Sequence, residues 1–334
     1  LIVGTAAGIQ FMDALGVDLW LFNNEDDPVC EQWFLSESAK FDWLDLATAN
    51  LCITSLRFGD FDGDGKTDVF RVSYLRSFTE EIPNPNYVPQ TRYDPCAGGY
   101  DVGYYDCDFD TEDEYVDYCT GYESDGASCD TTLNVVHRIY QFKYSSGGTS
   151  NWITMGDTSG LLSPLVGLSQ LRFGFFDDDN ITDIFVVDED GRWKYSSAGT
   201  GPWTNLAIGA NVNDMRFGDF DGDGKTDIFV KHDNRWKFSS GGSESWENLT
   251  TSNTPLDHLR FGYFDDDDVI DVFTESDGQW LYSSGGRTSW INLGSSGYDI
   301  EDLRFGDFDR NGFTDVFVKS GSQWKYSAGG LSDW

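Results

Sequence analysis

The chain repeats itself every 44 residues, and this period constrains its fold more than any other feature. The phrase Leu-Arg-Phe-Gly, or Met-Arg-Phe-Gly, places a phenylalanine at positions 58, 173, 217, 261 and 305. The last four lie 44 residues apart, and the first gap, of 115 residues, equals one period plus 71 residues. A fixed period of this length indicates a repeat architecture in which each unit packs against its neighbours.

A second marker gives the number of units. Six pairs of aromatic residues lie ten positions apart, at Trp33/Trp43, Phe142/Trp152, Trp193/Trp203, Trp236/Trp246, Trp280/Trp290 and Trp324/Trp334. Six pairs and five Arg-Phe-Gly motifs imply that one unit is degenerate. Residues 11–18 supply it, because they align with residues 220–227 but have lost the acidic alternation. The sequence therefore predicts six units.

Within a unit, the local patterns predict four short strands. Leu-Arg-Phe-Gly-Asp-Phe alternates, an acidic loop turns the chain, and Asp-Ile-Phe-Val-Val and Arg-Trp-Lys-Tyr-Ser form the next two strands. Ser-Ser-Gly-Gly is a hairpin signal, and Trp-x-Asn-Leu is the fourth strand. Four short strands per unit are typical of a propeller blade.

The predicted fold is thus all-β, a single β-propeller domain over residues 1–334 with six four-stranded blades. Five or seven blades, or a solenoid of stacked hairpins, are the alternatives. The chain ends just before the fourth strand of the last unit, and Leu1-Ile2-Val3-Gly4 resembles that strand. We therefore expect the two termini to complete one blade together.

Residues 75–135 depart from the repeat as an acidic, tyrosine-rich insertion within the second blade. We expect its two ends to extend the second and third strands as a ribbon. Four of the six cysteines lie in it (Cys96, Cys107, Cys119 and Cys129), and the others are Cys30 and Cys52. An even count in the irregular part of a chain favours disulfides in an oxidising compartment. A zinc site is the competing interpretation, although no closely spaced cysteine pair supports it. The insertion is either a recognition or intersubunit surface or a solvated, stapled loop.

Charge limits the classes of partner. The net charge of −36 argues against nucleic acid and anionic membranes. No stretch of the sequence is long and apolar enough to insert into a bilayer.

The acidic loops (residues 60–68, 175–183, 219–227, 263–271 and 307–315) carry carboxylates at alternate positions, as hard oxygen-seeking cations such as Ca²⁺ require. Numbered from 1 to 9, each loop would offer side chains from positions 1, 3, 5 and 9 and the carbonyl of position 7, as in the first part of an EF-hand loop. Three loops match fully, with Asp60, Asp62, Asp64, Lys66 and Asp68; Asp219, Asp221, Asp223, Lys225 and Asp227; and Asp307, Asp309, Asn311, Phe313 and Asp315.

Two loops have an aromatic residue at position 1. Phe175 precedes Asp177, Asp179, Ile181 and Asp183, and Tyr263 precedes Asp265, Asp267, Val269 and Asp271. These loops would bind more weakly or recruit Asp178, Asp266 or Asp268. Asn180 and Asp268 replace the turn glycine as residues that tolerate a left-handed backbone. Ordinary hairpin turns are the alternative, but five copies favour up to five Ca²⁺ ions.

The run Phe-Gly-Asp-Phe-Asp-Gly-Asp-Gly-Lys-Thr-Asp resembles the FG-GAP/VCBS repeat family, whose propellers are similar to the integrin α-subunit head and to certain fungal lectins. The resemblance covers five units well and a sixth loosely. It implies Ca²⁺ in the acidic loops on one face and secretion or cell-surface display. It implies no single function, because such repeats occur in adhesion proteins, lectins and non-catalytic modules of secreted hydrolases. Unit 1 departs at Met12 and Ala14, so no ion is expected there.

No catalytic motif is present, so we expect a secreted, non-catalytic module for recognition, adhesion or extracellular assembly. Its partner would be a glycan, an extracellular protein or another copy of the chain. One alternative is a lectin that uses exposed rings at Trp152, Trp203, Trp246 and Trp290. These rings could instead pack between blades. Another alternative is an accessory domain of a secreted polysaccharide-active enzyme.

Overall fold

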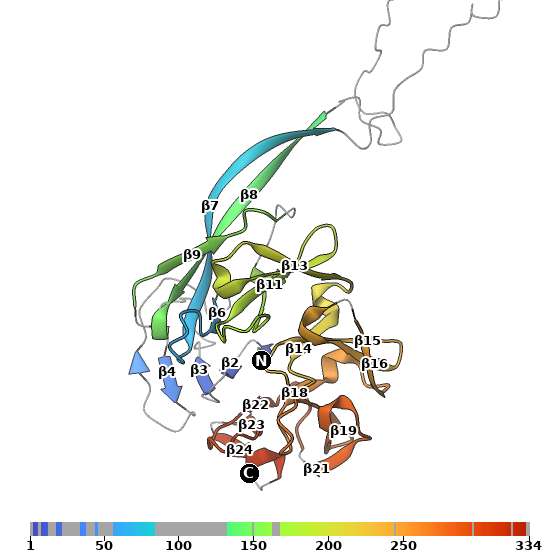
Figure 1. The fold of residues 1–334 in the computed structure, drawn as a ribbon. Helices are drawn as coiled ribbons and strands as arrows, with labels where there is room; N and C mark the ends of the chain where they lie inside the picture. Colours follow the sequence, from blue (N-terminus) through green and yellow to red (C-terminus); the bar gives the residue numbers. More distant parts are fainter. Residues whose placement is uncertain are drawn as a thin grey trace, which may run out of the picture. The chain divides into compact units, whose positions relative to one another are not determined.

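The computed structural model describes residues 56–83, 132–148, 150–161, 168–243, 245–295, 297–321 and 323–331, together with five short strands between residues 3 and 45. All regular elements in these residues are strands or single 3₁₀ turns (Figure 1). No helix among them is long and apolar enough to cross a membrane. The prediction of an all-β fold is confirmed.

The chain forms two compact units. One comprises residues 1–76 and 139–334, and the other comprises residues 77–138. Two long strands, β7 (Asp68–Pro83) and β8 (Thr132–Ser145), belong partly to each unit and are neighbours in one sheet. The predicted extension of the second and third strands into a ribbon is therefore present. Residues 84–131, with four of the cysteines, lie outside the described residues, as do Cys30 and Cys52.

Several antiparallel sheets of four strands follow one another along the chain. The sheet that carries the ribbon consists of β6 (Leu56–Gly59), β7, β8 and β9 (Ile153–Asp157). Three sheets then repeat one order of strands. They are β10 (Arg172–Gly174), β11 (Asp183–Val187), β12 (Arg192–Ser196) and β13 (Trp203–Ile208); β14 (Met215–Gly218), β15 (Asp227–His232), β16 (Arg235–Ser239) and β17 (Glu247–Thr251); and β18 (Arg260–Gly262), β19 (Asp271–Ser276), β20 (Gln279–Ser283) and β21 (Ile291–Ser295).

The first and last sheets differ from this pattern. The last has three strands, β22 (Arg304–Gly306), β23 (Asp315–Ser320) and β24 (Gln323–Ser327). The first has five, β1 (Val3–Thr5), β2 (Gly8–Met12), β3 (Asp18–Leu21), β4 (Phe34–Glu37) and β5 (Leu44–Asp45). The expectation that the N-terminal strand completes the last sheet is wrong in this structure, because Val3 pairs with Gln10 and Thr5 with Gly8. Closing a two-residue turn costs far less chain entropy than joining the two ends of the chain.

Short 3₁₀ turns connect the strands at repeated places. Between the third and fourth strands lie η2 (Ser146–Gly148), η4 (Ser197–Gly199), η6 (Ser240–Gly242) and η8 (Ser284–Gly286), and η9 (Ala328–Gly330) follows β24. Ahead of the first strands lie η3 (Leu168–Gln170), η5 (Val212–Asp214) and η7 (Leu256–His258). The Ser-Ser-Gly-Gly signal thus marks a tight hairpin, as predicted.

The core lies between neighbouring sheets and is largely aromatic. Phe220 stacks on Phe229 of its own sheet at 5.2 Å and meets Phe261 of the next sheet edge-on at 5.8 Å between ring centroids. All three rings are buried, and each contributes about 1.5 to 3 kcal/mol through burial. Because both faces of the second strands are covered, Asp227–Val230 is buried without alternation. This packing holds the acidic loops of successive sheets in equivalent positions.

Candidate metal centres

Every acidic loop in the described residues connects the first and second strands of its sheet. The first strand ends at the Gly of Arg-Phe-Gly, and the second begins at the aspartate of position 9, so Gly218 pairs with Asp227 across the loop base. The same register recurs for Gly59 with Asp68 and for Gly306 with Asp315. The hairpin therefore fixes the ends of each loop, and position 9 enters the sheet.

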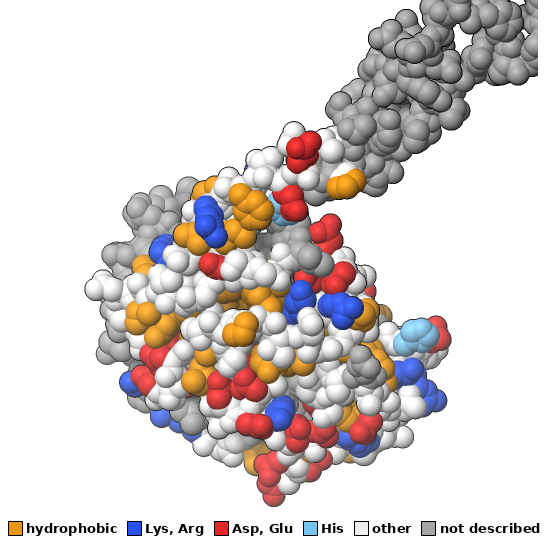
Figure 2. Space-filling model, turned by 45° about the horizontal axis from the view of Figure 1, so that its top comes forward, with side chains coloured by type: hydrophobic (Ala, Val, Ile, Leu, Met, Phe, Trp, Pro, Cys, Tyr) orange, Lys and Arg blue, Asp and Glu red, His pale blue; other side chains and the backbone are white. Residues whose placement is uncertain are grey.

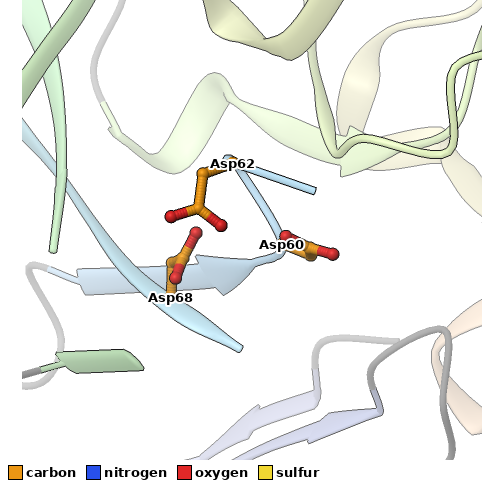
Figure 3. Close-up of side chains that lie close together, drawn as sticks. All are labelled: Asp60, Asp62 and Asp68. Carbon is orange, nitrogen blue, oxygen red and sulfur yellow. The ribbon is translucent and has the colours of Figure 1, made fainter. Parts of the chain in front are cut away.

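In each loop, three aspartates bring carboxylate oxygens within 4.8 Å of one another. Where position 1 is aspartate, the cluster comprises positions 1, 3 and 9, which are Asp60, Asp62 and Asp68; Asp219, Asp221 and Asp227; and Asp307, Asp309 and Asp315. Figure 3 shows the Asp62 and Asp68 carboxylates facing each other, with Asp60 beside them at the end of β6. Five clusters compatible with a metal ion thus repeat along the chain.

The two loops with an aromatic residue at position 1 form their clusters differently. They use positions 3, 5 and 9, which are Asp177, Asp179 and Asp183, and Asp265, Asp267 and Asp271. A serine of the following hairpin holds position 5, since Ser197 Oγ donates to Asp179 at 3.2 Å and Ser284 Oγ donates to Asp267 at 3.0 Å. Position 5 therefore replaces position 1. Asp178, an alternative ligand from the sequence, instead pairs with Lys225 Nζ of the next loop at 2.9 Å.

Position 5 lies outside the cluster where position 1 is aspartate. Asp64 accepts hydrogen bonds from the backbone N–H and the Nζ of Lys66, at 2.8 and 2.9 Å. In all five loops the N–H of position 7 donates to the side chain of position 5, an Asx-type turn at Lys66, Ile181, Lys225, Val269 and Phe313. The side chain of position 5 thus stabilises the turn in every loop by accepting this hydrogen bond.

Aspartate at position 1 organises the loop even before any ion is considered. Asp219 accepts the backbone N–H groups of Gly222 and Gly224 at 2.7 and 2.9 Å. Asp60 makes the same two bonds, with Gly63 and Gly65. Position 6 has a left-handed backbone throughout, including φ of 58° at Asn180 and 57° at Asp268, as the sequence predicts for these substitutes of glycine.

Position 9 is fully buried and bound on both sides. Asp227 is 0% exposed, and its two oxygens accept the N–H of Phe220 at 2.7 Å and the N–H of Gly241 in η6 at 2.9 Å. The second donor in the four other sheets comes from Gly147, Ala198, Gly285 and Gly329. Sequence reasoning missed these hairpin donors. The recurring Ser-Ser-Gly-Gly segment was their only signal.

The buried aspartates are electrostatically costly without a cation. Burial raises the pKa of Asp227 to about 7, against the lowering effect of its two backbone hydrogen bonds, and Asp221 and Asp219 raise it further. Asp183 and Asp271 also reach about 7, and Asp68 and Asp315 reach about 6, from the same leading cause. The clusters contain oxygen donors alone, which is the chemistry of Ca²⁺ and Mg²⁺ and not of zinc. The residues therefore fit a hard divalent cation. Figure 2 shows acidic side chains in several groups on one face.

The four candidate tryptophans contact neighbouring groups. Trp203, Trp246 and Trp290 each meet an aromatic ring of the preceding sheet edge-on, at 6.2 Å from Phe142, 5.7 Å from Trp193 and 5.4 Å from Trp236. The Arg71 guanidinium lies over Trp152 at 4.5 Å. Each ring therefore takes part in packing, and Trp246 is the most exposed of the four, at 37%.

Comparison with protein-family models finds no match for the chain, and comparison with curated proteins finds no relative.

Proposed function

We propose that this protein is a calcium-stabilised β-propeller of six blades that serves outside the cell as a non-catalytic recognition or assembly module. One observation carries the proposal: five carboxylate clusters occupy the same hairpin in five successive sheets. A single acidic turn is common on protein surfaces. Five copies, each with one carboxylate buried in the sheet, indicate that the ion is part of the fold.

Contacts between sheets support the propeller. Backbone hydrogen bonds join each acidic loop to the loop of the next sheet, from Asp60 to Thr182, Phe175 to Thr226, Asp219 to Ile270 and Tyr263 to Thr314. In addition, β2 of the first sheet lies close to β22 of the last. Successive links together with adjacent first and last sheets are the arrangement of a ring, whereas the ends of a solenoid lie apart.

Calcium is the ion that this donor set favours. The clusters are at the surface, because one carboxylate of each is exposed: position 3 in the three loops with aspartate at position 1, and position 5 in the other two. Ca²⁺ accepts six to eight oxygens in flexible geometry, whereas Mg²⁺ requires a strict octahedron. Extracellular modules of this kind bind Ca²⁺ with dissociation constants of about 10⁻⁴ to 10⁻³ M.

Thermal unfolding with different cations tests the proposal. The chelator-treated protein should melt well below the protein in millimolar Ca²⁺, because ions that bind only the folded state stabilise it. Mg²⁺ at the same concentration should recover only part of the difference. Equilibrium binding should saturate near five ions. An unchanged melting temperature after chelation would remove the basis for a calcium-dependent fold.

A glycan is the second candidate partner, and the partial exposure of Trp246 beside Trp193 favours it. A glycan array probed with the calcium-loaded protein and with the chelated protein tests this possibility. Light scattering across a concentration series tests self-assembly instead. Turnover of a polysaccharide would contradict the non-catalytic assignment.

A further inference from the structure

A second repeated feature lies in the first strands and is separate from the acidic loops. Each Arg-Phe-Gly motif contributes one half-buried arginine, and together they form the arginine series: Arg57, Arg172, Arg216, Arg260 and Arg304. Each one stands at or next to the start of its first strand, whereas the acidic loop follows the strand's other end. The carboxylate clusters therefore do not account for these side chains.

Arg216 illustrates how the series is held. Its Nη1 donates to the carbonyls of Asn213 and Met215 at 3.2 and 2.7 Å, within its own sheet's turn and strand. Its Nη2 reaches the carbonyl of Leu256, in the turn of the next sheet, at 3.4 Å. Arg260 repeats the arrangement with Asp257, Leu259 and Ile300. Carbonyl oxygens thus orient the guanidinium groups without neutralising them.

These contacts bring consecutive arginines together. Arg172 Nη2 lies 3.5 Å from the Asn213 side-chain oxygen, and Arg216 Nη1 donates to the carbonyl of the same residue. Arg216 and Arg260 likewise bond to the adjacent residues 256 and 257. Two donors that bond to one residue or to adjacent residues lie within about 10 Å of each other, given hydrogen bonds of about 3 Å. The guanidinium groups of successive sheets therefore lie near one another, at the starts of the first strands.

The charge of this group is not cancelled at contact distance. Within the described part of the chain, Arg172, Arg216 and Arg260 form no ion pair. Burial lowers the pKa of Arg172, and Arg57 and Arg216 lower it further. Asp214 and Asp257 act in the opposite direction on Arg216, as Glu301 does on Arg260, but from beyond contact distance. A concentration of positive charge is unexpected in a chain of net charge −36.

We propose that Arg172, Arg216 and Arg260 form a binding site for a small multivalent oxyanion of the sulfate or phosphate class. A guanidinium carries five N–H donors in a planar fork that matches such oxygens. The three bonds of Arg216 leave its Nε hydrogen and one Nη2 hydrogen without an acceptor among the described residues. The Nε of Arg260 also has no acceptor. Lysine would not serve equally, because its ammonium lacks the fork.

Calorimetric titration of the calcium-loaded chain with sodium sulfate tests the site, with chloride adjusted so that ionic strength stays constant. We expect saturable binding of one sulfate. Arg216→Met should weaken sulfate binding about 10-fold or more, because methionine forms no charge-assisted hydrogen bond with the anion. Arg216→Lys should weaken binding less, because lysine keeps the charge and loses only the planar donor geometry. Arg235→Met, which removes an exposed arginine of β16, is the matched control and should leave the affinity unchanged.

A second arm uses sodium phosphate below the concentration at which calcium phosphate precipitates, and it identifies the preferred anion. Absence of saturable binding of either anion to the wild-type chain overturns the proposal, whether or not the variants fold. Equal weakening by Arg216→Met and Arg235→Met also overturns it, because it would show a diffuse surface effect. If Arg216→Met lowers stability by the same amount with and without sulfate, the arginine series only links the sheets. That result also overturns the proposed anion site.

Discussion

Asp60 and Thr182 belong to different sheets and form a reciprocal pair of hydrogen bonds. The N–H of Asp60 donates to Thr182 Oγ1 at 2.9 Å, and the N–H of Thr182 donates to the Asp60 carbonyl at 2.7 Å. Phe175 with Thr226 and Tyr263 with Thr314 repeat the pair. Position 1 of one acidic loop is thus joined to position 8 of the next, so that an ion bound in one loop would also restrain its neighbour.

Thr226→Val tests this link by removing the acceptor of the Phe175 N–H. We expect a loss of about 1 to 2 kcal/mol, since a partly buried donor is left without a partner. Urea unfolding in saturating Ca²⁺ measures it, and Thr251→Val at an exposed position of β17 is the matched control. The chain itself contains a weaker version, because Ile270 keeps only the backbone bond to Asp219. A variant as stable as the control would show that the hydroxyl contributes nothing.

Gly174→Ala tests how closely the sheets approach at the same place. A Cβ on Gly174 would lie 2.6 Å from Thr226 Oγ1, closer than real contacts allow, so we expect about 1 to 3 kcal/mol of destabilisation. Gly297→Ala adds the same methyl in open space and serves as control. In the double variant Gly174→Ala/Thr226→Ala, part of the loss should return, because the two sites are in contact. Strict additivity of the two single changes would contradict the inferred clash.

The sequence predicts those parts of the structure that depend on local spacing. The alternation around Phe217, the hairpin after Ser239 and the carboxylates at Asp219, Asp221 and Asp227 all concern residues close in the chain. Their patterns specify strands, turns and the acidic loop directly. The repeat shows the glycine of Arg-Phe-Gly, but it does not show the close approach of the next sheet that requires a glycine there.

What the sequence does not reveal are partnerships between sheets. Thr182 and Asp60 are separated by 122 residues, and no local pattern indicates which group a threonine hydroxyl will meet. The sequence also does not show whether position 1 or position 5 joins the carboxylate cluster, because position 5 is held by Ser197 and Ser284 of later hairpins. The pairing of Val3–Thr5 with β2 depends on the balance between a short turn and chain closure, which composition alone does not fix.

Asp221→Asn tests the carboxylate cluster of one acidic loop. Replacing a charged ligand by a neutral amide should remove most of the stabilisation that this ion supplies, about 2 to 3 kcal/mol when Ca²⁺ exceeds its dissociation constant 100-fold. In chelator the variant should be no less stable than wild type, because one repelling charge has gone. Melting with and without Ca²⁺ provides the comparison.

Asp233→Asn, with the same charge change on a side chain that is 89% exposed, is the control for Asp221→Asn. Asp223→Asn distinguishes the two ligand sets. An effect as large as that of Asp221→Asn would mean that Ca²⁺ recruits position 5, as the sequence spacing predicts. An equal loss for Asp221→Asn in chelator and in Ca²⁺ would contradict a metal role for position 3.

The buried aspartates of position 9 predict opposite pH responses with and without calcium. Their folded pKa values, about 6 for Asp68 and about 7 for Asp227, lie above the ordinary value of 3.8 because of burial. In the metal-free protein they favour folding when protonated, so their contribution is complete below pH 3.8 and is lost as pH rises toward 7. Calcium needs the ionised form, so its affinity should fall as pH drops below 7. The chelated protein should therefore melt at a higher temperature at pH 5.5 than at pH 8, while the gain from Ca²⁺ should be larger at pH 8. Scanning calorimetry at both pH values measures the two trends, and a Ca²⁺ gain independent of pH would show that position 9 does not bind the ion.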